Sequence, residues 1–179
     1  AWLALGATLT GTAPAAGAQA VARSVAPVVA RGRVDTLTFW SQALGTRKRA
    51  LVWLPPSYSS QPARRYPSVY YLHGMWGSEI DWTTQGQLDV TLDSMVAAGL
   101  PEMIVVMPDG HAIAPGTTGF AEYAPANSAA LGNELVQDII PLVESSYKVV
   151  TKPDGRAFAG LSMGGHHALT MALDRKSVV

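Results

Sequence analysis

The chain lacks cysteine altogether and carries little charge. Its 179 residues include no Cys, and 13 basic residues balance 13 acidic ones, so that charged residues make up only 15%. The missing cysteine excludes disulfides, thiolate metal ligands and a cysteine nucleophile from these residues. The balanced charge provides no electrostatic reason for a nucleic-acid partner or an anionic membrane surface. The composition, 48% hydrophobic, predicts one globular domain with neither nucleic acid nor membrane as a partner.

Long apolar runs are also missing, including at the N-terminus. Residues 1–20 are uncharged, but their apolar core is too short and too rich in Gly, Thr and Pro for a stable transmembrane helix. The segment ends in small residues that fit the A-x-A cleavage pattern twice, at 16–18 and 18–20. We expect residues 1–20 to be an incomplete secretory signal peptide, which implies a secreted or periplasmic bacterial protein. A disordered Ala-rich leader is the alternative.

The rest of the sequence alternates short apolar runs with helical patterns. Period-two alternation predicts an antiparallel hairpin at one edge of a sheet, formed by residues 33–40 and 49–54. Apolar runs predict three further strands, at 68–72, 103–107 and 157–159. Amphipathic spacing predicts three helices, at 81–98, 133–147 and 166–173, whereas residues 111–128 predict a long loop. Strands that alternate with helices indicate parallel βαβ units and an α/β fold.

The clearest functional motif is G-x-S-x-G at residues 160–164. It follows a predicted strand and precedes a predicted helix, which is the context of a nucleophile elbow. Gly160 and Gly164 allow the strand and the helix to approach closely at a sharp turn, where a Cβ would clash. Ser162 would then be exposed near the positive end of the helix dipole. For the bare pattern, a chance glycine-rich turn is the alternative.

A second motif, HGMWG at residues 73–77, supplies the other part of such a site. A serine nucleophile requires two backbone N–H donors aimed at the developing oxyanion. In this architecture one donor belongs to the residue after the serine, Met163, and the other to the loop after the third strand. Met75 N–H is the predicted second donor, and Gly74 provides the tight loop geometry. An ordinary strand-ending turn is the alternative for this motif.

Together these motifs resemble the putative-esterase family of α/β hydrolases, which includes feruloyl esterases, S-formylglutathione hydrolases and the mycolyltransferase antigens. The resemblance covers about residues 33–173 and runs through YLHG at 71–74, GSE at 77–79, DW at 81–82, VMPDG at 106–110, EL at 134–135, RA at 156–157 and GLSMGGH at 160–166. It implies the N-terminal part of an α/β-hydrolase fold: a mostly parallel sheet with an antiparallel N-terminal hairpin and helices on both faces.

The resemblance also implies a chemistry. Ser162 would be the nucleophile of a serine carboxylic-ester hydrolase that works through an acyl-enzyme, with Met75 and Met163 as oxyanion-hole donors and with no metal or organic cofactor. The secreted feruloyl and acetyl-polysaccharide esterases look nearest, so the partner would be a small-molecule or polysaccharide-linked ester. An acyltransferase of the mycolyltransferase type and a non-catalytic binding protein on a hydrolase scaffold are the alternatives.

The sequence departs from the family after the serine. The family places the triad acid and then the histidine on loops of later strands, whereas 17 residues follow Ser162. We therefore expect residues 21–173 to be a partial esterase domain that is inactive by itself, and residues 174–179 (DRKSVV) to be a non-native tail.

Other polar and aromatic residues are weaker candidates. Strand ends at 73–75, 108–110 and Ser162 are expected to converge, because ligands in such sheets bind beyond the carboxyl ends of the strands.

The histidines are disfavoured as bases: His73 as a local packing residue, His111 as a loop residue near the site, His166 and His167 as residues tied to the helix after the serine. Simple roles are predicted for the acids: turn residues (Asp109, Asp154), a helix-surface charge (Asp138) and caps of the first helix (Glu79, Asp81). Three aromatic residues are candidates for an acyl pocket, although core or loop packing is favoured: Trp76, Trp82 and Tyr123.

Overall fold

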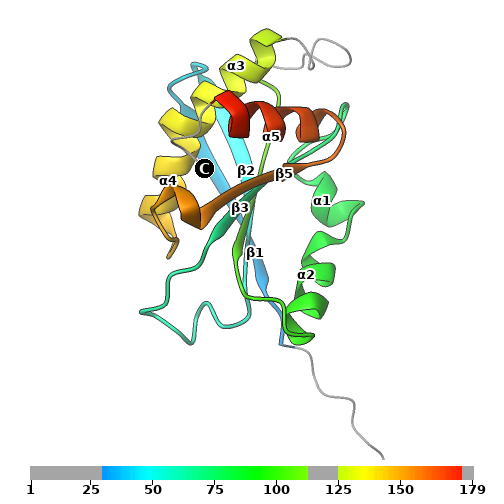
Figure 1. Cartoon of the computed structure of the whole chain (residues 1–179), viewed down its shortest axis with the longest axis vertical. Coiled ribbons are helices and arrows are strands. Elements are labelled where there is room, and N and C mark those ends of the chain that lie inside the picture. Colours follow the sequence, from blue (N-terminus) through cyan, green and yellow to red (C-terminus); the bar gives the residue numbers. More distant parts are fainter. Residues whose placement is uncertain (1–29, 113–124, 175–179) are drawn as a thin grey trace, which may run out of the picture.

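A computed structural model describes residues 30–112 and 125–174. They form a five-stranded sheet in the order β1-β2-β4-β3-β5, with helices on both faces (Figure 1). The strands are β1 Arg33–Ser41, β2 Thr46–Leu54, β3 Ser68–Leu72, β4 Ile104–Pro108 and β5 Arg156–Gly160. The predicted leader at 1–20 lies outside the described residues, and so does nearly all of the predicted tail, whose first residue ends the last helix.

The sheet is mixed. The antiparallel hairpin β1–β2 forms one edge, as predicted, and β2 continues antiparallel to β4. Parallel pairing begins at β4, which pairs with β3, and β3 pairs in turn with β5. Within the described residues β5 is the other edge strand. Every residue of β4 is buried, as expected for a strand covered on both faces.

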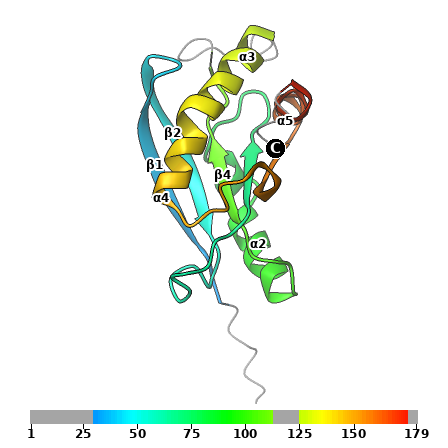
Figure 2. The same cartoon turned by 60° about the vertical axis from the view of Figure 1, so that its left-hand side comes forward.

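Alternating side chains divide the interior into two cores. One face of β2 and β4 contributes Val52, Leu54 and Val106 to a core that includes side chains of the later helices. The opposite face contributes Leu51, Trp53, Val105 and Met107 to a smaller core with Leu92. Figure 2 shows the helix that begins at Pro125 on the side of the sheet opposite to the helix that carries Leu92.

The first predicted helix, 81–98, is in fact two helices. α1 (Asp81–Thr84) and α2 (Leu88–Ala97) are separated by Gln87, which has a left-handed φ of 45°. A Cβ on Gly86 would lie 2.9 Å from the carbonyl oxygen of Trp82, so the chain turns at a glycine that permits close approach. The predicted end at Gly99 is confirmed: its φ is +104°, and Leu100 N–H donates to Met95 O (2.9 Å).

The second predicted helix begins earlier than its periodicity indicated. α3 (Pro125–Glu134) continues through a π-helical turn, η2 (Leu135–Ile139), into α4 (Ile140–Ser146). The loop prediction was therefore wrong for residues 125–128, while residues 113–124 lie outside the described residues. In the wide turn Ile140 N–H donates to Leu135 O, directly before Pro141, which has no N–H of its own to donate.

Two predicted roles of acidic residues were wrong. Asp138 is not a surface charge: its half-buried carboxylate accepts hydrogen bonds from Ser41 Oγ (2.9 Å) and Ala43 N–H (3.0 Å), which tie the helix to the β1–β2 turn. The N-cap residue of α1 is Ile80, whose side chain makes no capping hydrogen bond, so neither Glu79 nor Asp81 is the cap. Glu79 instead forms an ion pair with Arg49, with 3.4 Å between Oε1 and Nη1.

Candidate functional site

The G-x-S-x-G motif forms the sharp strand-to-helix turn that the sequence predicted. β5 ends at Gly160, and helix α5 runs over Met163–Asp174. Its first residue lies three positions before the predicted start at residue 166. Between them Ser162 is exposed and has a φ of 53°, a left-handed conformation that is strained for a residue with a side chain. Such strain persists only where the surrounding structure imposes it.

The surrounding backbone does impose it. A Cβ on Gly160 would lie 2.4 Å from Gly164 C, and a Cβ on Gly164 would lie 2.1 Å from Leu72 O. Leu161 N–H also donates to Leu72 O (3.2 Å), which ties the turn to the end of β3. The steric reason predicted for both glycines is therefore confirmed. His166 N–H donates to Ser162 O (3.0 Å), so the serine stands at the positive end of α5.

The HGMWG loop lies beside this turn. Gly77 N–H donates to Gly74 O (3.1 Å), and Trp76, the third residue of the resulting turn, has a φ of 63°, as in a type II turn. A Cβ on Gly74 would lie 3.5 Å from Leu161 O, so loop and elbow are in contact. Both line one cavity of about 330 Å³, whose walls are His73, Gly74, Met75, Gly77, Asp81, Trp82, Gln85, Gly86 and Leu161.

The ends of three strands converge at this edge of the sheet, as predicted. His73, at the end of β3, accepts a hydrogen bond at Nε2 from Gly110 N–H (2.8 Å), beyond the end of β4. A Cβ on Gly110 would in turn lie 3.8 Å from Cε of Met163, at the start of α5. The structure therefore brings the loops after β3, β4 and β5 into contact.

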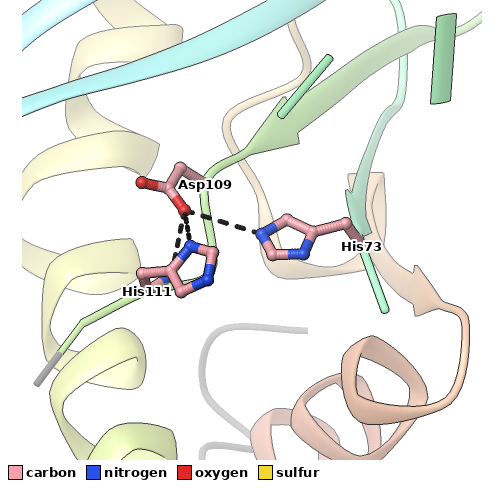
Figure 3. Close-up of side chains that lie close together, drawn as sticks. All are labelled: His73, Asp109 and His111. Carbon is pink, nitrogen blue, oxygen red and sulfur yellow. Dashed lines mark hydrogen bonds and ion pairs between the residues drawn. The ribbon is translucent and has the colours of Figure 1, made fainter. Parts of the chain in front are cut away.

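The structure also reveals a charged cluster that the sequence reasoning missed (Figure 3). Figure 3 shows three of its members: Asp109 Oδ1 lies 2.5 Å from His111 Nδ1 and 3.6 Å from His73 Nε2. The other oxygen of Asp109, Oδ2, accepts a hydrogen bond from Lys48 Nζ (2.8 Å). Burial opposes the charge on this carboxylate, but the hydrogen bond from His111 and the charge and hydrogen bond of Lys48 outweigh it and hold the pKa of Asp109 well below its usual range. Asp109 does follow β4 as the turn prediction said, yet it is the centre of this cluster.

Strand alternation was the available signal for Lys48. In the sequence TRKRA the side chains of Arg47 and Arg49 are exposed and that of Lys48 is buried, since neighbouring residues of a strand face opposite sides. A buried lysine requires a partner, and Asp109 is that partner.

The atoms of this cluster are close enough to raise the question of a metal. One ligand atom each of His73, Asp109 and His111 lies within 4.8 Å of the others. However, Nε2 of His73 already accepts the Gly110 N–H, and Asp109 already binds Lys48 and His111. The cation of Lys48 would also repel a metal ion. The cluster therefore fits an internal hydrogen-bond network better than a metal site.

The two histidines of α5 face different surroundings. His167 is buried, and its ring nitrogens lie 2.9 Å from Ser128 Oγ and 3.4 Å from Asn127 Nδ2. Burial, together with the neighbouring His166 and His73, lowers the pKa of His167 to about 4, so it is neutral at pH 7. His166 is exposed.

The aromatic candidates also separate. Trp76 is 70% exposed. Trp82 packs edge-on against Tyr71 (4.4 Å between ring centroids) and lines the cavity. Tyr123 lies outside the described residues.

Comparison with known proteins identifies the family. Residues 41–178 match the family model described as "Putative esterase". The chain belongs to this esterase family. It is 32% identical over 153 residues to an endo-1,4-beta-xylanase/feruloyl esterase of Xylanibacter ruminicola, with 80% of this chain and 20% of that protein covered. It is 33% identical over 139 residues to an esterase of Mycobacterium tuberculosis, with 75% and 28% covered.

Solved structures show the same fold. A ferulic acid esterase from Anaeromyces mucronatus, in complex with ferulic acid, aligns with a TM-score of 0.74 at 28% identity over 88% of this chain and 58% of that one. An S-formylglutathione hydrolase from Agrobacterium tumefaciens aligns with a TM-score of 0.64 at 18% identity, over 82% and 55%. The predicted α/β-hydrolase fold is thus confirmed. The chain spans a little over half the length of these structures and about a quarter or less of the two curated relatives.

Proposed function

We propose that this protein is a serine carboxylic-ester hydrolase that works through an acyl-enzyme on Ser162. The observation that carries the proposal is the strained, exposed position of Ser162 (φ 53°) between β5 and the start of α5. Ser162 Oγ attacks the ester carbonyl, the bond to the alcohol oxygen breaks, and the alcohol leaves with a proton. Water then hydrolyses the acyl-enzyme. The N–H groups of Met75 and Met163 stabilise the oxyanion that forms in each step.

We further propose that the 179 residues alone hydrolyse esters slowly or not at all. A serine is a weak nucleophile unless a histidine accepts its proton. His73 and His167 contact other groups through both ring nitrogens, and Nδ1 of His111 lies against Asp109. His166 is carried by α5 itself, four residues after Ser162. A triad histidine and acid from other residues complete the active enzyme.

The proposed substrate is a feruloyl or acetyl ester of a plant polysaccharide. Relatives named as feruloyl or ferulic acid esterases support the aromatic acyl group, and the cavity beside Leu161 has the indole of Trp82 in its wall. Secretion is part of the proposal and is supported by the composition of residues 1–20. No helix of the described residues has the length and apolarity needed to cross a membrane. No metal or organic cofactor takes part.

The test uses the intact protein and a fluorophosphonate probe, which reacts with activated serines. We expect Ser162→Ala to abolish labelling and to lower kcat for methyl ferulate by about 10⁴-fold or more. Ser94→Ala is the matched control, because Ser94 is an exposed helical serine on α2. Both activities should survive in that control. An intact protein that neither labels nor hydrolyses esters would contradict the proposal, as would hydrolysis that persists in Ser162→Ala.

A further inference from the structure

We infer that His73 is a positioning residue of the oxyanion hole, whose imidazole sets the direction of the Met75 N–H. The inference rests on the proposed role of Met75 as an oxyanion donor. His73 is 2% exposed, so its ring does not reach bulk solvent and acts on its immediate neighbours. Its two ring nitrogens contact two different loops, the one after β3 and the one after β4.

These two contacts define the tautomer of the ring. Nε2 lies 2.8 Å from Gly110 N–H, which can only donate, so Nε2 must be the unprotonated nitrogen. Nδ1 lies 2.8 Å from Gly74 O, which can only accept, so Nδ1 must carry the proton. The neutral Nδ1–H form satisfies both neighbours at once. The other neutral tautomer would satisfy neither, and the imidazolium would point an N–H at the Gly110 N–H.

The Gly74 carbonyl and the Met75 N–H belong to one peptide group. The described residues contain no cis peptide bond, so this group is trans and planar, and its C=O and N–H bonds point in opposite directions. Two donors hold the carbonyl: His73 Nδ1–H (2.8 Å) and Gly77 N–H (3.1 Å). Fixing the carbonyl on that side fixes the Met75 N–H on the other, where Met75 lines the cavity beside Leu161.

The loop is built around this contact. A Cβ on Gly77 would lie 2.9 Å from Gly74 O and 3.1 Å from His73 Nδ1, so a glycine is required where the ring and the carbonyl meet. Trp76 takes the positive φ of the turn although it is not glycine. A peptide at a strained turn can rotate, and a rotated peptide would direct its N–H away from the substrate. A buried donor on the carbonyl oxygen opposes that rotation.

Two substitutions at position 73 separate this role from simple packing. The amide nitrogen of Asn occupies the place of Nδ1, so His73→Asn keeps the donor to Gly74 O and loses the acceptor for Gly110. The amide oxygen of Gln occupies the place of Nε2, so His73→Gln keeps the acceptor and loses the donor. Each variant loses one buried hydrogen bond, so their melting temperatures should fall by similar amounts.

Their kinetics should differ. Removing an oxyanion-hole donor costs about 10²–10³ in kcat, and a misdirected donor costs less. We expect His73→Gln to lose about 10- to 100-fold in kcat for a p-nitrophenyl ester with KM within about twofold, since the oxyanion forms only in the transition state. His73→Asn should stay within about fivefold of wild type. Equal loss of kcat in both variants, or a change confined to KM, would overturn the inference.

A measurement independent of turnover accompanies the kinetics. Long-range ¹H–¹⁵N NMR of the imidazole reports which ring nitrogen carries the proton. We expect the neutral Nδ1–H form of His73 at pH 7, and the Nε2–H form would refute the inference even in an active enzyme. If the intact wild-type protein shows no Ser162-dependent chemistry while the Nδ1–H form is present, the proposed function fails and the held peptide remains as a structural feature.

Discussion

Glu134 provides a sharp test of how burial and charge are balanced near Lys48 and Asp109. It is the last residue of α3, is 0% exposed, and neither carboxylate oxygen has a hydrogen-bond partner among the described residues. Burial raises its pKa from 4.5 to about 7, with smaller contributions from the carboxylates of Asp109 and Asp138, while the charge of Lys48 opposes the shift. A buried carboxyl group of this kind should make folding stability depend on pH.

The direction of this pH dependence follows from the number of protons that the folded and unfolded states bind. Below pH 4.5 both the folded and the unfolded protein carry the proton, so the group has no effect. As pH rises from 4.5 to 7 the unfolded chain loses the proton while the folded protein keeps it, so stability falls. Above pH 7 the loss is complete. The difference between about 7 and 4.5, at about 1.4 kcal/mol per pH unit, gives about 3 kcal/mol.

The assay is urea unfolding of wild type and Glu134→Gln at pH 4.5 and pH 8. The amide is uncharged at both pH values, so its own cost of burial cancels between them. We expect the variant to gain about 3 kcal/mol relative to wild type on going from pH 4.5 to pH 8. Asp154→Asn, at an exposed turn, is the control. Its stability relative to wild type should change by less than about 0.5 kcal/mol between the two pH values. A pH-independent effect of Glu134→Gln would refute the reasoning.

Three further substitutions test the elbow, the charged cluster and the strained loop. Gly164→Ala places a Cβ 2.1 Å from a backbone oxygen of β3 and should destabilise the protein by about 3 kcal/mol in thermal melts. Gly165→Ala is the control: its Cβ would lie 3.2 Å from Gly160 O, and stability should change by less than about 1 kcal/mol. Similar effects at both positions would contradict the steric account. Asp109→Asn leaves the buried ammonium of Lys48 without its carboxylate and should cost about 3–5 kcal/mol in urea unfolding at pH 7. Because the pKa of Asp109 is lowered, the stability difference between wild type and Asp109→Asn should shrink as pH falls below about 4. A pH-independent difference would show that the ionised carboxylate is not the source of the stabilisation. Trp76→Gly relieves a positive φ at a side chain that is 70% exposed, so the melting temperature should not fall by more than a few degrees; a large fall would show that the indole packs.

Several elements of the fold could be predicted from short stretches of the sequence. Residues 33–41 alternate because one face of this edge strand is half-buried, and the bounds of β3 follow from its apolar run. The elbow was predictable because its geometry depends on two glycines and a serine within five residues, 160–164. Gly99 ends α2 for an equally local reason, its access to positive φ.

Other features were not visible in the apolar pattern. The break at Gln87 and the π-helical turn before Pro141 interrupt helices whose apolar spacing continues through them. Periodicity does not reveal such interruptions, because the side chains on either side still face the core.

The network around Asp109, in contrast, joins residues that are far apart in the sequence. Its members come from β2 and from the loops after β3 and β4, and only the folded sheet brings Lys48, His73 and Asp109 together. The sequence by itself therefore determined the strands, the elbow and the family resemblance, since these follow from sterics and burial along a single stretch of chain. Only the tertiary structure decided which polar groups meet at the ends of β3 and β4, because hydrogen bonds and ion pairs between distant segments depend on how the strands are ordered in the sheet.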